Sequence, residues 1–222
     1  MKRPLLLSLM LSPLAAFAEP EAPPPVEEES TSHFELAMGF MGGDRDYRGA
    51  GFSYTGGEGG AGGGKSLIEP LERSPFDGAR AFGPSWELRQ VVERVRFTVG
   101  LQKPFTSFRL SDATSVTADG QQVGARSLSS WELRLGLGFE YQLGRVTPFV
   151  DLIGQIDWLT AQLTVDQQPA TYRASSFAMS ARGGARIQVS KLVFVAPSAE
   201  VGFTGDVRWT AQLMVGIKLP FD

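Results

Sequence analysis

The segment Trp131–Leu143, WELRLGLGFEYQL, alternates between apolar and polar residues without interruption. Its odd-numbered positions are all apolar or aromatic, whereas its even-numbered positions carry glycine, glutamine or a charged residue. A period of two over so long a stretch predicts a β-strand with one apolar and one polar face. At about 3.3 Å per residue this strand would be about 40 Å long, whereas strands of soluble proteins usually have about 5–6 residues.

The same alternation recurs along the chain and predicts eight strands, of which the one at 104–111 is the weakest. The alternating segments are residues 34–40, 95–101, 104–111, 131–143, 150–158, 173–189, 193–203 and 209–221. Short gaps are expected around Lys103, Gly144-Arg145 and Ser190-Lys191. The other gaps cover residues 43–84, 112–128 and 161–172 and a tight 205–207. Short turns on one side, mostly longer loops on the other and an even strand number are typical of an all-β, eight-stranded antiparallel up-and-down transmembrane β-barrel.

A repeated pentapeptide fits this hairpin plan. SWELR occurs at Ser85–Arg89 and at Ser130–Arg134, and each copy is followed by strand-like sequence and then by Pro-Phe, at 104–105 and at 148–149. We interpret each SWELR as the start of a strand that returns from the outer surface, with its tryptophan at or above the outer aromatic belt. Each Pro-Phe would start the next strand, where a missing N–H is tolerated. A repeat of five residues can also arise by chance, and the hairpins do not depend on it.

The two copies differ in the phase of their apolar positions. In the first copy the phase slips between Leu88 and Val91, which predicts a β-bulge there. In the second copy the alternation continues without a slip, so that Glu132 and Arg134 are expected to face the interior.

Alternation alone does not decide whether the apolar faces point outward to lipid or inward, as in a soluble lipocalin-like barrel. Apolar faces that are unbroken by charge suit a lipid-facing band of about 25 Å. The polar faces hold equal numbers of acidic and basic side chains, as a closed interior requires, because an unpaired buried charge costs several kcal/mol. We therefore predict apolar faces outward and a lumen ion-pair network. The predicted network comprises Glu35, Arg94, Arg96, Glu132, Arg134, Glu140, Asp151, Asp157, Arg182, Arg186, Glu200 and Lys218.

The N-terminal residues predict export. Residues 1–18 combine a basic start, an apolar stretch and the small-x-small site Ala16-Phe17-Ala18, which is the order of a secretory signal peptide. The proline- and glutamate-rich residues 19–32 are expected to form a solvated periplasmic linker. The barrel is then expected over residues 33–222, with a long first extracellular loop at about 43–84.

Composition excludes several other classes of protein. No stretch after the signal peptide is long and apolar enough to be a transmembrane helix. The absence of cysteine excludes disulfides and thiolate metal sites. A net charge of −3 gives no electrostatic case for binding nucleic acid.

Three features of the sequence could indicate a catalytic or ligand-binding site, but each is better explained as ordinary barrel structure. Residues 59–66, GGAGGGKS, match the P-loop pattern, but they lie in a glycine-rich segment where such spacings are common, so we expect a loop that binds no nucleotide. His33, the sole histidine, is expected at the periplasmic rim, away from any reaction at the outer leaflet. Asp151 and Asp157 are about 20 Å apart along one strand, too far to form one site unless a neighbour contributes. No catalytic, cofactor-binding or metal residues are predicted, and no cofactor.

The C-terminal segment MVGIKLPF resembles the β-signal that the barrel-assembly machinery reads in outer-membrane proteins. Gly216, Leu219 and Phe221 match the pattern, whereas Met214 stands where a polar residue is usual and Asp222 follows the aromatic position. The resemblance implies that Gly216, Leu219 and Phe221 form an assembly signal.

Residues 135–150, LGLGFEYQLGRVTPFV, resemble the repeated hairpin of small OmpA/OmpX-type barrels, and the resemblance spans about 33–222. It implies an outer-membrane protein of a Gram-negative-type envelope that contacts membrane lipid and the barrel-assembly machinery, as a monomer. Because side chains about fill the interior of an eight-stranded barrel, we expect a non-enzymatic role in envelope structure or surface contact. The alternatives are an outer-leaflet lipid-modifying barrel enzyme and a narrow small-solute channel.

Overall fold

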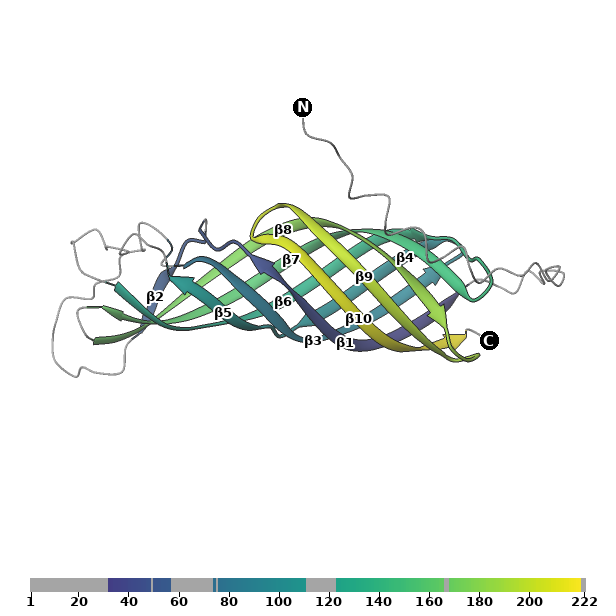
Figure 1. The fold of residues 1–222 in the computed structure, drawn as a ribbon. Coiled ribbons are helices and arrows are strands. Elements are labelled where there is room, and N and C mark those ends of the chain that lie inside the picture. The colour runs from purple at the N-terminus through teal and green to yellow at the C-terminus, as the bar shows by residue number, and fades with distance from the viewer. Residues whose placement is uncertain are drawn as a thin grey trace, which may run out of the picture. The chain divides into compact units, whose positions relative to one another are not determined.

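One antiparallel sheet closes into a ring, because β1 pairs with β10 at one end of the strand order and with β3 at the other (Figure 1). The computed structural model describes residues 32–48, 50–56, 74, 76–110, 123–165 and 168–220, all within one unit, Thr31–Asp222. Its strands are β1 (His33–Arg45), β2 (Ser53–Gly56), β3 (Phe76–Val92), β4 (Val95–Gln102), β5 (Phe105–Leu110), β6 (Val123–Glu140), β7 (Val146–Val165), β8 (Gln168–Gln188), β9 (Val193–Thr204) and β10 (Val207–Pro220).

Eight of these strand positions make the wall of the barrel. β4 and β5 follow each other along the chain and both pair with β3 and with β6, so together they form one wall strand. β2 lies off the ring and pairs with β8. The prediction of an eight-stranded antiparallel up-and-down barrel is therefore confirmed.

One predicted turn was placed wrongly. The chain reverses between β3 and β4 at Glu93 and Arg94, where Glu93 has a left-handed φ of 57°, and not around Lys103. Lys103 and Pro104 instead interrupt a single wall strand, and the Lys103 N–H donates to the Pro84 carbonyl at 3.2 Å. The first Pro-Phe thus lies in the middle of a strand, where the missing N–H of proline explains the break. The second Pro-Phe does lie near the start of its strand, β7.

The expected bulge between Leu88 and Val91 is also absent. β3 keeps an unbroken register from Ser85 to Val92 against β4, and throughout its pairing with β1. The apparent slip of phase arises because Val91 is an apolar residue that faces the barrel interior, where it is fully buried.

The strands extend further into the predicted loops than expected. The first loop begins after Arg45 and ends before Phe76, and the expected loop at 161–172 is mostly a hairpin that joins β7 to β8. The signal peptide, most of the linker, the glycine-rich residues 59–66 and Phe221 lie outside the described residues. Among the described residues, no helix is long and apolar enough to cross a membrane.

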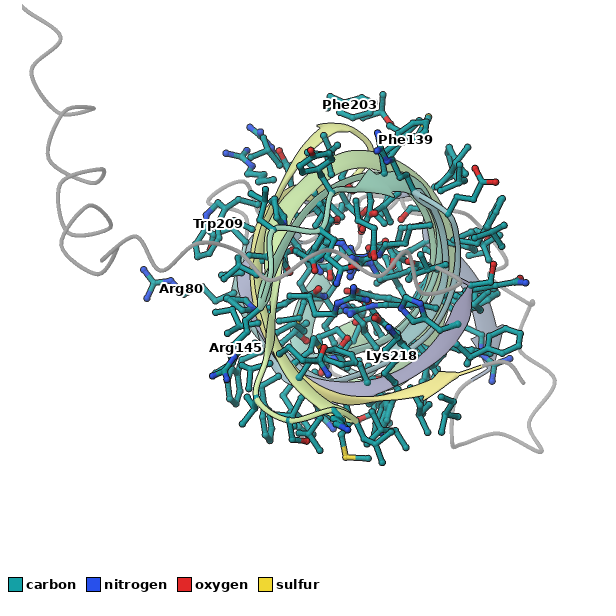
Figure 2. The ribbon with its side chains drawn as sticks, turned by 90° about the vertical axis from the view of Figure 1, so that its right-hand side faces the viewer. Arg80, Phe139, Arg145, Phe203, Trp209 and Lys218 are labelled. Carbon is teal, nitrogen blue, oxygen red and sulfur yellow. The ribbon has the colours of Figure 1, made fainter. Side chains whose placement is uncertain are left out.

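The outer surface of the barrel is apolar. Along β6, Trp131, Leu135, Leu137 and Phe139 are all well exposed, as predicted for an apolar face turned outward. The row from Trp131 to Leu143 spans about 30 Å along the membrane normal at a tilt of about 40°, close to the lipid-facing band of known barrels. Viewed along the barrel, Phe139, Phe203 and Trp209 lie outside the ring while nitrogen and oxygen atoms gather within it (Figure 2). This surface is that of a transmembrane barrel.

Candidate functional site: the filled lumen

Strand parity places the charged residues inside the barrel. Because alternate side chains of a strand point to opposite faces, the outward row of β6 leaves Glu132, Arg134 and Glu140 pointing into the lumen. The same parity holds on the other strands. The buried charged residues of the lumen are Glu35, Arg45, Glu87, Arg89, Arg96, Glu132, Arg134, Glu140, Asp151, Asp157, Arg182, Arg186 and Glu200.

Eight of these side chains form a closed cycle in which carboxylates and guanidinium groups alternate. In order around the cycle they are Glu35, Arg89, Glu87, Arg182, Asp151, Arg96, Glu140 and Arg186, with Arg186 returning to Glu35. We call this set the ion-pair ring. It contains four acidic and four basic groups, so it adds no net charge to an interior where an uncompensated charge is expensive.

Arg182 joins two carboxylates of the ring through short contacts. Its guanidinium lies 2.6 Å from Asp151 and 2.5 Å from Glu87, and it also donates to the amide oxygen of Gln212 at 3.2 Å. Arg96 makes longer contacts with carboxylates, the one to Asp151 being 3.5 Å. Its guanidinium lies 3.7 Å from the centre of the Phe149 ring. A cation over an aromatic face gains electrostatic stabilisation that partly replaces hydrogen bonds.

Two further pairs extend the network toward the loop end of the barrel. Arg134 contacts Glu87 of the ring at 3.7 Å and pairs with Glu200 on β9. Arg45 forms a two-pronged contact with Glu132, at 3.2 Å from Nε and 2.9 Å from Nη2. Bidentate geometry makes an Arg–carboxylate contact both stronger and more specific.

Most of the residues that the sequence placed in the network do lie together in the lumen, with one clear exception. Arg94 is exposed in the β3–β4 turn, where its guanidinium lies 5.2 Å from the centre of the Tyr141 ring. Its side chain is outside because Arg94 lies in the turn between β3 and β4, whereas the sequence analysis placed it in a strand. Lys218 follows the inward parity of β10 and is half-buried. Asp157 faces the lumen but accepts hydrogen bonds from Gln155 and Ser176 and joins no ion pair among the described residues.

Sequence reasoning missed Glu87, Arg89 and Arg45. Glu87 and Arg89 belong to the first SWELR and have the same inward parity as Glu132 and Arg134 of the second. The repeat therefore indicated that Glu87 and Arg89 face the lumen. The predicted bulge hid this, because a bulge would have turned these two side chains to the other face. Arg45 was assigned to a loop because the end of β1 could not be located from the alternation.

A glycine makes room for one member of the ring. A Cβ at Gly138 would lie 2.2 Å from Asp151 Oδ1 and equally close to the Val150 carbonyl oxygen. No side chain fits at such a distance, so glycine at this inward position allows the Asp151 carboxylate to reach Arg182 and Arg96.

Apolar clusters also occupy the lumen. Beside the ion-pair ring, Ala37, Phe194, Ala196 and Met214 pack together, and the Arg89 guanidinium lies 5.8 Å from the centre of the Phe194 ring. At the loop end lies a larger set that we call the outer core. Its members are Tyr47, Phe52, Phe76, Ala79, Leu128, Leu159, Ala161, Leu163 and Tyr172.

The outer core coincides with a change in the chemistry of the wall. Along β7, the inward side chains change from Asp157 to Leu159 and Leu163, while the outward ones change from Trp158 to Gln162. β6 shows the same change, because Trp131 pairs with Trp158 and outward residues beyond it are serines and an arginine. Beyond these tryptophans the barrel is apolar inside and polar outside, as in a soluble protein.

The residues considered as possible catalytic or metal-binding groups, His33, Asp151 and Asp157, lie apart from one another. His33 is buried at the short-turn end, with Nε2 3.1 Å from Glu35 and 2.9 Å from Arg186. Asp151 belongs to the ion-pair ring, whereas Asp157 lies nearer the loop end. Within the described ranges, no group of three or more acidic, histidine or cysteine side chains has the spacing of a metal site.

No protein-family model and no curated protein sequence matches the chain. Among solved structures, the outer membrane protein OprG from Pseudomonas aeruginosa is similar to this chain, with a TM-score of 0.54 and 10% sequence identity. The match covers 87% of this chain and 98% of the OprG chain. Neisserial surface protein A covers 85% and 97%, with a TM-score of 0.48 and 13% identity. Ail, the attachment invasion locus protein of Yersinia pestis, covers 86% and 100%, with a TM-score of 0.47 and 11% identity.

The likeness to OprG shows the fold, and it agrees with the closed ring, the apolar exterior and the charged interior of this chain. The predicted resemblance to small outer-membrane barrels is thus confirmed at the level of the fold. The chain is a transmembrane β-barrel of the outer-membrane type.

Proposed function

We propose that this protein is a non-enzymatic barrel of the outer membrane that stabilises the envelope or contacts other molecules at the surface, and that it does not conduct solutes. The observation that carries this proposal is that the lumen is filled by the ion-pair ring, by the apolar residues Ala37, Phe194, Ala196 and Met214 beside it, and by the outer core. A pore would need a continuous polar path, which the outer core and the locked ion pairs oppose.

Two experiments test this proposal. Cell fractionation with heat-modifiable gel migration should place the folded barrel in the outer membrane, because closed barrels resist detergent until heated. Planar-bilayer recordings of the purified protein should then show no discrete channel steps. Stable single-channel conductance would favour the narrow-channel alternative and overturn the closed lumen.

Surface contact is supported by the part of the barrel beyond the tryptophans. There β7 and β8 form a long hairpin beside β6, and exposed polar side chains such as Arg126 on β6, Gln162 on β7 and Arg173 on β8 face outward. Transmembrane barrels without such an extension end near the lipid headgroups. We infer that this extension, which we place outside the cell, is the contact surface.

The position of His33 supports the non-enzymatic proposal. Lipid modification at the outer leaflet would need catalytic groups near the loop end, whereas His33 is buried beside Glu35 at the short-turn end. His33→Gln should leave outer-leaflet lipid composition, measured by mass spectrometry, the same as in the wild type. A change in lipid acylation that depends on His33 would instead support the enzyme alternative.

We also propose that Gly216, Leu219 and Phe221 are read by the barrel-assembly machinery. Leu219 projects outward from β10, where its side chain is free for recognition before insertion, whereas Gly216 also makes room for Phe194. Leu219→Ser and deletion of Phe221 should both lower the yield of folded barrel in cells. Leu213→Ser is the matched control, since Leu213 lies on the same outward row of β10 but outside the motif.

A further inference from the structure

Just below the outer core, the lumen carries more negative than positive charge. Glu132 and Asp157 are direct cross-strand partners on β6 and β7, and both are buried. Asp206, in the tight turn between β9 and β10, is 4% exposed. Like charges directly opposite on neighbouring strands destabilise a sheet, so this arrangement requires compensation.

The nearby arginine compensates only one of the three carboxylates. Arg45 makes its two-pronged contact with Glu132 and donates its remaining hydrogen bonds to Thr210 and the Asp44 carbonyl. Within the part of the chain that the structure describes, neither Asp157 nor Asp206 has a cationic side chain within ion-pair distance. Two buried carboxyl groups therefore remain without an ion-pair partner among the described residues.

Several buried oxygen atoms near these two carboxylates have no partner among the described residues. The β9–β10 turn lies against β8, because a Cβ at Gly205 would be 2.6 Å from Ala178, the cross-strand partner of Gln155 on β7. Asp206 follows Gly205, and neither of its carboxylate oxygens has a hydrogen-bond donor among the described residues. The Gln155 amide donates to Asp157 at 2.7 Å, and its own oxygen has no partner. The Tyr47 hydroxyl is buried and likewise without a partner among the described residues, and the N–H of the preceding residue, Asp46, donates to the Asp206 carbonyl at 2.6 Å.

This set of atoms has the chemistry of a cation site. One shared proton would leave a buried charge of −1, whereas a divalent cation would neutralise both aspartates. All the available ligand atoms are oxygens, which hard cations prefer, and Ca²⁺ tolerates irregular geometry better than Mg²⁺ does. We propose that Asp157 and Asp206 bind a divalent cation of the calcium type, with Gln155 and Tyr47 supplying neutral oxygens.

Only two carboxylates contribute, because Glu132 is engaged by Arg45. A site with so few charged ligands binds weakly, in the range of about 10⁻⁴–10⁻³ M that is typical of extracellular calcium modules. The bound ion would tie the β9–β10 turn to β7 where the transmembrane part meets the outer core. This inference does not depend on the proposed function.

The test uses the full mature barrel, refolded in detergent and freed of metal with EDTA, and measures the temperature at which heat-modifiable migration is lost. CaCl₂ at about 10 mM should raise that midpoint by about 3–10 °C in the wild type. Asp157→Asn and Asp206→Asn should lose this response, and in EDTA they should be at least as stable as the wild type, because repulsion is removed. Asp46→Asn, which alters a neighbouring surface ion pair, should keep the response.

A second measurement covers the case in which a variant fails to fold. Tb³⁺ added to the wild type should give luminescence sensitised by nearby aromatic rings, and Ca²⁺ should displace it. The proposal is overturned if Ca²⁺ neither stabilises the wild type nor displaces Tb³⁺. An equal loss of response in Asp46→Asn would also overturn it, since the effect would then come from surface charge.

Discussion

The two parts of the barrel on either side of Trp131 and Trp158 have opposite arrangements of polar and apolar side chains. We call the part toward the short turns the lower part and the part toward the loops the upper part. Below, charged side chains such as Arg182 and Glu87 are locked inside, and leucines and phenylalanines cover the outside. Above, Leu163 and Tyr172 pack inside, and Gln162 and Arg173 face outward. β7 and β8 and their parity run through the boundary without a break, so on these strands only the side chains change.

The solvent outside the wall explains the difference. In lipid, the apolar side chains must face outward, so the interior is left to polar groups, which have to satisfy one another. Above the membrane, water surrounds the wall, and burial of apolar side chains inside stabilises the barrel as it does in soluble proteins. The inversion of polarity therefore marks the outer boundary of the membrane on this molecule.

The largest effect should follow from breaking the ion-pair ring. Arg182→Met removes the partner of Asp151 and Glu87 and leaves buried charge uncompensated, so the free energy of unfolding in detergent should fall by about 3–5 kcal/mol. Urea titration followed by tryptophan fluorescence would measure it. Arg80→Met, at an exposed arginine, should change stability by less than about 0.5 kcal/mol, and a similar loss at both positions would contradict the role of the ring.

A charge added to the outside should be costly below the boundary and harmless above it. Leu135→Arg places a guanidinium in the apolar band and should cost about 2–4 kcal/mol in lipid vesicles. Gln162→Arg makes the corresponding change on the outward face of β7 beyond Trp158, and we expect no measurable loss. Equal costs in vesicle unfolding assays would place the membrane boundary elsewhere.

Truncation in the outer core should destabilise the extension without opening the transmembrane ring. Leu163→Ala leaves a cavity beside Phe76 and Tyr172 and should cost about 2–3 kcal/mol, felt locally. Limited trypsin digestion should then cut faster at Arg173 and Arg126, while the heat-modifiable core band remains. Loss of that band at the same rate would show that the two parts unfold as one.

The smallest effect concerns a surface group beyond the boundary. Hydrogen bonds from Arg48, and a further one from Arg208, lower the pKa of Asp46 below its ordinary value. A lowered pKa in the folded state stabilises the fold above the unfolded value of about 3.9, and this contribution is lost as the pH falls through the folded pKa. The wild type should therefore be slightly more stable than Asp46→Asn at pH 7, and this difference should shrink below about pH 3. A difference that persists at low pH would argue against the ion pair.

Outside β3, β4 and β5, the sequence alone determined the wall of the barrel within the membrane. Strict alternation in segments such as Trp131–Leu143 specifies both the strand and its lipid face, because lipid leaves little freedom in what covers the outside. The prediction from sequence was wrong where two different structures produce the same local pattern. Val91 resembled a bulge, and Lys103-Pro104 resembled a turn, because local sequence does not show what lies across the lumen.

Only the tertiary structure decided which charges meet. Glu35, Glu87 and Asp151 come from three different strands, and closure of the ring brings them to the same arginines. It also showed that β7 continues to Val165 and that β8 begins at Gln168. The reversal of inward and outward chemistry there hides these strand ends from any single periodic pattern. Pairing across a closed barrel depends on register and shear, which are properties of all the strands together and cannot be assigned to any one of them.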